Sequence, residues 1–177
     1  MNYRDLKDIL ELIILIMLCV FIFIASYERT YAASPVEITV TVPEYQEYFD
    51  EIGEEYGISS CLLEAMAYTE SRLDASAVSD NGKYFGLMQI SKSVWNERKD
   101  RLGLTDIFDA KDNITCAADY LMELANTYGT EEDLADISLV LDIYSGHSNA
   151  FELFEDGKMS SYSTKVLEME QLLSIYR

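Results

Sequence analysis

A single glutamate is the strongest candidate for chemistry in this sequence. Glu70 falls in the last turn of a predicted apolar helix, three residues after Ala67 and four after Met66, so its carboxyl shares the buried face. Removal from water favours the neutral acid and raises the pKa of a carboxyl, as a general acid near neutral pH requires. The segment alone leaves a second interpretation open, in which Glu70 is a half-exposed helix-end glutamate with no catalytic role.

The other groups that could take part in chemistry are few. His147 is the single histidine, stands in a predicted turn, and is interpreted as a solvated or packing side chain. One histidine is too few for a histidine-based zinc site or a Ser-His-Asp triad. Asp74 and Asp80 could supply a second carboxylate for a hydrolase, although loop residues of this type usually make local turn hydrogen bonds. Residues 74–85 hold too few oxygen ligands for a calcium loop. We therefore expect neither a metal nor a cofactor.

Four motifs follow one another between residues 45 and 176. They are Glu70-Ser71 with Ala77-Val78-Ser79, Gly82 and Gly86-Leu87-Met88-Gln89-Ile90; Asn113-Ile114 with Tyr120-Leu121; Tyr144; and Tyr162 with Lys165-Val166. Together they resemble the signature of the soluble-type (SLT) peptidoglycan lytic transglycosylases of the lysozyme-like superfamily. The resemblance implies a mainly α, lysozyme-like fold with a small β element.

The resemblance also implies an activity. Such an enzyme cleaves the β-1,4 bond between N-acetylmuramic acid and N-acetylglucosamine and leaves 1,6-anhydromuramyl ends, for wall remodelling or local wall opening. Two alternatives stay open. One is a muramidase, which releases reducing ends with water. The other is a non-catalytic glycan-binding subunit of an envelope-spanning secretion or conjugation machine.

The resemblance assigns roles to individual residues. Glu70 would be the catalytic acid and base. Substrate-binding roles fall on Ser71, Met88, Gln89, Tyr144 and Tyr162. The glycine turn is one residue longer than the family's, which would place Lys83 and Tyr84 at the cleft edge. After Tyr144, the residues Ser145-Gly146-His147 stand where the family has Asn-Ala-Gly.

Composition limits the choice of partners. The chain has 177 residues, about one domain, and 49% of them are hydrophobic, too many for a disordered acidic polymer. A net charge of −19 excludes a nucleic-acid binder, because phosphate contacts need clustered cations. Peptidoglycan glycan strands, the implied substrate, are often anionic as well, so we expect binding to depend on a local cleft with Arg72, Lys83 and Lys92 near Glu70.

The N-terminal region has the pattern of an export segment. Leu12–Ala25 is an unbroken apolar run, shorter than the roughly 20 residues that span a bilayer and similar to the apolar part of a signal peptide. We expect residues 1–33 to form a single-pass anchor through residues 9–25, in preference to a cleaved signal peptide. Residues 34–43 would be an extended linker and residues 44–177 an extracytoplasmic catalytic domain in the cell envelope.

Hydrophobic spacing predicts about six helices in that domain. They cover residues 44–56, 59–71, 92–101, 112–128, 131–145 and 162–176, with a loop or short hairpin over residues 74–90. Cys61 and Cys116 open two helices that are expected to pack together in the implied fold. They could form a disulfide or remain two buried thiols.

Overall fold

A computed structural model describes residues 45–128 and 137–177 of the chain. The predicted anchor, signal segment and linker therefore lie outside the described residues. The elements in chain order are α2 (Gln46–Tyr56), α3 (Ser60–Ser71), β1 (Tyr84–Phe85), β2 (Ile90–Ser91), α4 (Lys92–Leu102), α5 (Ala110–Tyr128), α6 (Ile137–Tyr144), α7 (Ala150–Glu155) and α8 (Ser161–Tyr176). This arrangement confirms the predicted mainly α class with a small β element. Among the described helices, none combines the length and apolar character needed to cross a bilayer.

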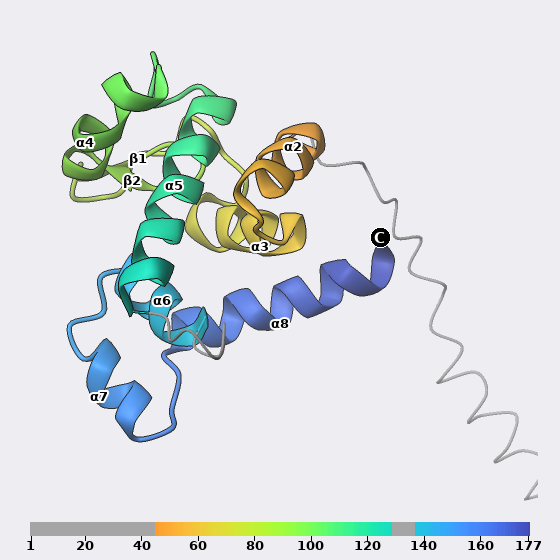
Figure 1. Cartoon of the computed structure of the whole chain (residues 1–177), viewed down its shortest axis with the longest axis vertical. Coiled ribbons are helices and arrows are strands. Elements are labelled where there is room, and N and C mark those ends of the chain that lie inside the picture. Colours follow the sequence, from red (N-terminus) through yellow and green to blue (C-terminus); the bar gives the residue numbers. More distant parts are fainter. Residues whose placement is uncertain (1–44, 129–136) are drawn as a thin grey trace, which may run out of the picture. The chain divides into compact units, whose positions relative to one another are not determined.

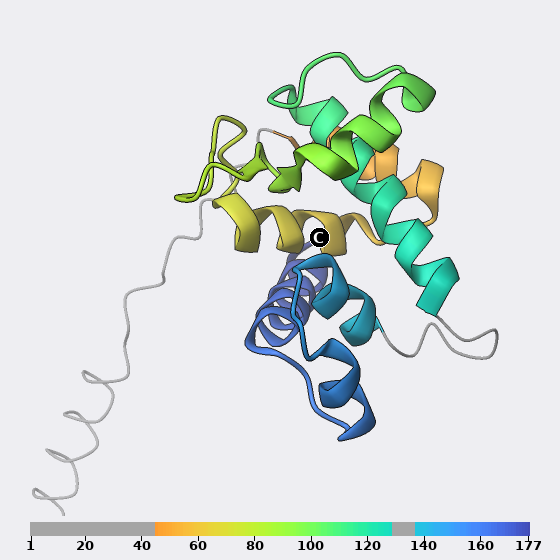
Figure 2. The same ribbon diagram turned by 90° about the vertical axis from the view of Figure 1, so that its left-hand side faces the viewer.

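Helix α3 is the central element (Figure 1). It packs against α2 and along α8, while α5 contacts both α2 and α6. Seven consecutive residues of α3 are buried, from Cys61 to Ala67, because neighbours cover the helix on several sides. In Figure 2, α3 lies between α8 on one side and the hairpin and α4 on the other. The catalytic candidate therefore stands at the end of the most buried helix.

Capping residues fix several helix boundaries close to the predicted ranges. The Ser59 hydroxyl accepts a hydrogen bond from the Leu62 amide (3.2 Å) and caps α3. Helices α2 and α4 end at Gly57 and Gly103, both in the left-handed conformation.

The predicted start of α5 is wrong by two residues. This helix begins at Ala110 rather than at Asp112, because the Asp109 carboxylate accepts from the Asp112 amide (2.9 Å) and occupies the capping position. The Asp112 carboxylate instead accepts from the amides of Thr105 (2.7 Å) and Asp106 (3.0 Å) in the preceding loop.

The predicted hairpin is a two-stranded antiparallel sheet in which Tyr84 pairs with Ser91 and Phe85 with Ile90. Its turn is fastened to α5 by the fully buried Asn113. The Asn113 carbonyl oxygen accepts from the Met88 amide (2.7 Å), and its Nδ2 donates to the carbonyls of Phe85 (3.1 Å) and Ile107 (2.7 Å). The turn therefore has a fixed position relative to the helices.

The C-terminal part departs further from the prediction. Helix α6 is described from Ile137, and the first part of the predicted helix 131–145 lies outside the described residues. Helix α7 is an additional element that hydrophobic spacing did not predict. Cys61 and Cys116 are buried free thiols, the second of the two alternatives, and burial raises the pKa of the Cys116 thiol to about 12.

Candidate active site

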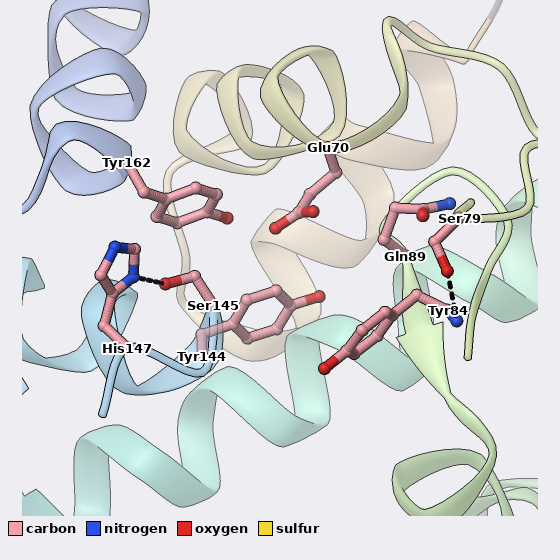
Figure 3. A pocket seen from close by; sticks show the side chains of 8 residues that line it. All are labelled: Glu70, Ser79, Tyr84, Gln89, Tyr144, Ser145, His147 and Tyr162. Atoms are coloured by element: carbon pink, nitrogen blue, oxygen red, sulfur yellow. Dashed lines mark hydrogen bonds between the residues drawn. The ribbon is translucent and has the colours of Figure 1, made fainter. Parts of the chain in front are cut away.

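A pocket of about 340 Å³ opens where α3, the hairpin, α6 and α8 meet. Figure 3 shows the side chains that surround it: Glu70, Ser79, Tyr84, Gln89, Tyr144, Ser145, His147 and Tyr162. These residues come from segments far apart in sequence. Five of the residues predicted from the sequence are brought together here, namely Glu70, Tyr84, Gln89, Tyr144 and Tyr162.

Glu70 occupies the last turn of α3, and its carboxyl points into the pocket (Figure 3). Burial raises the pKa of this carboxyl to about 7. The chain turns away immediately after Ser71, because Arg72 (φ +59°) and Leu73 (φ +65°) both adopt the left-handed conformation. Non-glycine residues rarely take this conformation, and two in succession are a local strain of the kind found near functional sites.

Two tyrosines face Glu70 from different helices. The buried Tyr162 hydroxyl has no hydrogen-bond partner among the described residues and points toward Glu70 (Figure 3). Burial is the larger effect on the Glu70 pKa and raises it, whereas the nearby Tyr162 hydroxyl, a potential hydrogen-bond donor to the carboxyl, lowers it. The Tyr144 hydroxyl donates to the Met88 carbonyl (3.0 Å), which joins α6 to the hairpin turn. Burial also holds the pKa of both phenols above the ordinary value, so both stay neutral.

The hairpin turn presents Gln89 to the pocket. Gln89 has φ +49°, and its Nε2 donates to the Gly86 carbonyl (2.9 Å). The side-chain nitrogen of Gln89 is therefore used within the turn. Among the described residues, no donor reaches its side-chain oxygen, Oε1. That oxygen is the polar group that the turn offers to a ligand.

Ser71 and Met88 lie outside the pocket lining, contrary to the roles that the resemblance implies. The Ser71 hydroxyl donates to the Leu87 carbonyl (2.7 Å) and accepts from the Asp74 amide (3.2 Å). Met88 is fully buried, and its carbonyl accepts from Tyr144. Both residues hold the turn in place against α3 and α6.

Of the two residues expected at the cleft edge in the longer glycine turn, only Tyr84 lines the pocket. Tyr84 lines the pocket with 40% of its surface exposed, whereas the Lys83 side chain is outside the lining. The Ser79 hydroxyl accepts from the amides of Lys83 (3.2 Å) and Tyr84 (3.0 Å) and so shapes the turn.

The expected cluster of cations is also absent from the lining. The Arg72 guanidinium lies over the Tyr68 ring, 4.6 Å from its centroid, and the Lys92 ammonium lies 5.0 Å from the centroid of Phe85. Like Lys83, neither contributes to the pocket wall.

Ser79, Ser145 and His147 line the pocket and were not predicted as site residues. The Ser145 hydroxyl lies 2.9 Å from the Asp142 carbonyl and 2.6 Å from His147 Nδ1. These two contacts hold Ser145 between the backbone of α6 and the His147 ring. Ser79 belongs to the first of the four motifs, and the departure from Asn-Ala-Gly was the signal in the sequence that pointed to Ser145 and His147.

Among the described residues, Glu70 is the only carboxylate in the pocket lining. Asp74 and Asp80 are exposed, and Asp74 accepts from the Ser76 amide (2.9 Å) and hydroxyl (2.7 Å) within its own loop. In the same part of the chain, no group of His, Cys, Asp and Glu side chains is arranged to hold a metal ion. The site therefore offers one acid–base carboxyl, two phenols, one imidazole and amide and hydroxyl groups.

Known proteins resemble both the sequence and the fold. Two membrane-bound lytic murein transglycosylases F, from Desulfosudis oleivorans and Enterobacter sp. strain 638, are 30% and 39% identical over 54% and 47% of this chain. The chain spans only 20% and 15% of their lengths. The X-ray structure of the lytic transglycosylase Slt from Pseudomonas aeruginosa has the same fold (TM-score 0.54, 17% identity, 72% of this chain and 22% of that chain). The family model for the transglycosylase SLT domain matches residues 47–145, more than half of the chain, which therefore belongs to the transglycosylase SLT family.

Proposed function

We propose that this protein is a peptidoglycan lytic transglycosylase that cleaves the β-1,4 bond between N-acetylmuramic acid and N-acetylglucosamine. The observation that carries the proposal is Glu70, a partly buried carboxyl with a pKa raised to about 7 and the only carboxylate among the described residues of the pocket. Membership of the SLT family and the names of the relatives support it.

The geometry fits a reaction that needs one carboxyl group. Protonated Glu70 gives its proton to the glycosidic oxygen as that bond breaks. The resulting carboxylate then takes the proton of the muramyl C6 hydroxyl, whose oxygen bonds to the anomeric carbon and closes the 1,6-anhydro ring. Because this nucleophile belongs to the substrate and is already close, no second carboxylate is needed to activate water. Glycosidases that use water or a covalent intermediate normally have two.

Other pocket residues bind and orient the glycan. The Gln89 carbonyl oxygen accepts from a substrate amide or hydroxyl, and the half-exposed Tyr84 ring offers an apolar face for a sugar. The Tyr162 hydroxyl stabilises the Glu70 carboxylate after the first proton transfer. Ser71 and Met88 support the turn, and Lys83 lies beyond it.

The whole chain would work in the cell envelope. Residues 1–33 would anchor it through residues 9–25, residues 34–43 would link the anchor to the domain, and residues 44–177 would face the wall. Since no described cation lines the pocket, an acidic domain gains little from electrostatic attraction to an anionic wall. Tethering, or assembly with secretion or conjugation machinery, would keep the domain near its substrate.

The products test the proposal directly. Purified full chain in detergent is incubated with peptidoglycan, and the fragments are analysed by mass spectrometry. We expect anhydromuramyl ends, which are lighter than reducing ends by one water. Reducing ends would instead identify a muramidase, and glycan binding without release would identify a non-catalytic subunit.

Cleavage should be lost as the pH rises through about 7. The first proton transfer needs neutral Glu70, and the fraction of neutral Glu70 falls as the pH passes its pKa of about 7. Initial rates of anhydromuramyl release at substrate concentrations well below KM, which report kcat/KM and therefore the free enzyme, should show this basic limb between about pH 5 and pH 9. A rate that already falls near the ordinary glutamate pKa would show that burial does not control the acid.

A further inference from the structure

Asp142 joins the two elements that carry the tyrosines facing Glu70. It lies on α6, is 2% exposed, and accepts hydrogen bonds from the Ser160 amide (3.1 Å) and the Ser160 hydroxyl. The Ser160 oxygen in turn accepts from the amides of Tyr162 (3.1 Å) and Ser163 (3.2 Å), the first turn of α8. Because the Ser160 proton is directed to Asp142, the serine lone pairs face the helix. The carboxylate therefore orients the cap of α8.

The backbone of Asp142 organises the other side of the pocket. Its carbonyl accepts from the Ser145 hydroxyl (2.9 Å) and from the His147 amide (3.0 Å). These contacts shape the turn that follows Tyr144 and places Ser145 and His147 in the lining. One residue thus holds both the end of α6 and the beginning of α8.

The burial of this carboxylate is costly. No described cation forms an ion pair with Asp142, and removing a carboxylate from water without a partner is strongly unfavourable. The two Ser160 donors and the N-terminus of α8 are the groups that offset the cost. The Asp142 carboxylate on α6 receives its side-chain hydrogen bonds from Ser160, the cap of α8. The position of α8 is therefore coupled to that of α6. The side chain that this junction carries into the site is Tyr162, whose buried hydroxyl faces Glu70 without a hydrogen-bond partner among the described residues.

We propose that Asp142 is a positioning residue, which acts through Ser160 and the first turn of α8 to hold the Tyr162 hydroxyl against Glu70. The proposal deepens the proposed function, on which its catalytic consequence rests. The Tyr162 dipole stabilises Glu70 when it is charged, between the two proton transfers. Loss of the connection through Ser160 would leave the charged Glu70 without the phenol that stabilises it.

Replacement of Asp142 with Asn distinguishes two effects on the Glu70 pKa: the loss of the Asp142 charge and the displacement of the Tyr162 hydroxyl. The remaining titratable groups that line the pocket with Glu70 are Tyr84, Tyr144, His147 and Tyr162. Removal of a negative charge near the site, taken alone, would lower the pKa of Glu70. Displacement of the Tyr162 hydroxyl would raise it, because that hydroxyl lowers the Glu70 pKa in the intact protein. The proposal therefore predicts the opposite sign from a direct effect of charge.

The test is a double-mutant cycle read by NMR. The Glu70 carboxyl, labelled with ¹³C and assigned by its absence in Glu70→Gln, is titrated in the full chain, in Asp142→Asn, in Tyr162→Phe and in the double variant. We expect a raised Glu70 pKa in each single variant and no further rise in the double variant, because both changes remove the same contact. A lowered or unchanged pKa in Asp142→Asn, or full additivity, would overturn the proposal.

Matched variants control for general loss of stability. Asp112→Asn removes a carboxylate that also accepts from two backbone amides, but in the loop before α5 and outside the pocket lining, and should leave the Glu70 pKa unchanged. If Asp142→Asn does not fold, Ser160→Ala interrupts the same connection and should raise the Glu70 pKa, whereas Ser160→Thr keeps the hydroxyl and should not.

In cleavage assays, Asp142→Asn should lower kcat by about tenfold with little change in KM. The titration does not require activity, so a failure of the proposed function would be seen separately.

Discussion

Replacement of Glu70 with Gln is expected to abolish cleavage while the protein stays folded. The amide has nearly the shape of the acid but cannot deliver a proton, and general acid–base catalysis contributes about 10² to 10⁴ in rate. The folded state raises the pKa of Glu70 from 4.5 to about 7, so it favours the neutral acid. The stability that neutral Glu70 provides is complete below 4.5 and is lost as the pH rises through about 7. Glu70→Gln should therefore be at least as stable as the native chain above neutral pH.

Release of anhydromuramyl ends, followed by mass spectrometry, measures the loss of activity, and thermal unfolding at pH 8 measures stability. Asp74→Asn is the matched control, because it changes an exposed carboxylate in the loop after α3 and should retain cleavage. Undiminished cleavage by Glu70→Gln would remove Glu70 from the mechanism. Loss of cleavage in Asp74→Asn as well would point to a second carboxylate and to hydrolysis.

Replacement of Gly86 with Ala is expected to have the largest effect on stability. Gly86 has φ +76°, and an added Cβ would lie 2.4 Å from Asn113 Nδ2 and 2.6 Å from the Ile107 carbonyl oxygen. Neither neighbour can move freely, because Asn113 is buried and fixes the hairpin turn through three hydrogen bonds. The strained backbone and the overlap together should lower the free energy of unfolding by about 2 to 5 kcal/mol.

Gly82→Ala separates the two contributions. Gly82 also has positive φ (+66°), but an added Cβ meets no atom within 4 Å. This variant should lose only about 1 to 2 kcal/mol from backbone strain. Urea unfolding of both variants in the same buffer gives the comparison. Equal losses would show that the turn can move away from Asn113 and that its position in the site is adaptable.

The sequence was sufficient to predict the parts that depend on local rules. Helical spacing placed Glu70 beside Met66 and Ala67, and in the structure Glu70 is partly buried in the last turn of α3 with a raised pKa. Gly57 and Gly103 follow the last residues of their helices in the left-handed conformation, which glycine adopts readily because it has no side chain. Such features are set by residues within one or two turns of each other.

The parts that sequence reasoning missed depend on distant partners. The Ser71 hydroxyl meets the Leu87 carbonyl sixteen residues later instead of facing a ligand. His147 enters the pocket because Asp142 and Ser145 fix the turn before it. Helix α7 is only six residues long, and its preceding residue Asn149 makes no side-chain capping bond, so neither periodicity nor a cap could identify it.

The assembly of the pocket from separate helices has a consequence for the newly made chain. The pocket around Glu70 is completed by Tyr144 of α6 and Tyr162 of α8, which follow Glu70 by 74 and 92 positions. Until α8 docks along α3, water reaches Glu70, and its pKa stays near the ordinary 4.5, so the group is ionised at neutral pH. An incompletely folded chain therefore carries no usable acid. Acid–base competence and completion of folding arise in the same step, which protects the glycan from any intermediate that exposes α3.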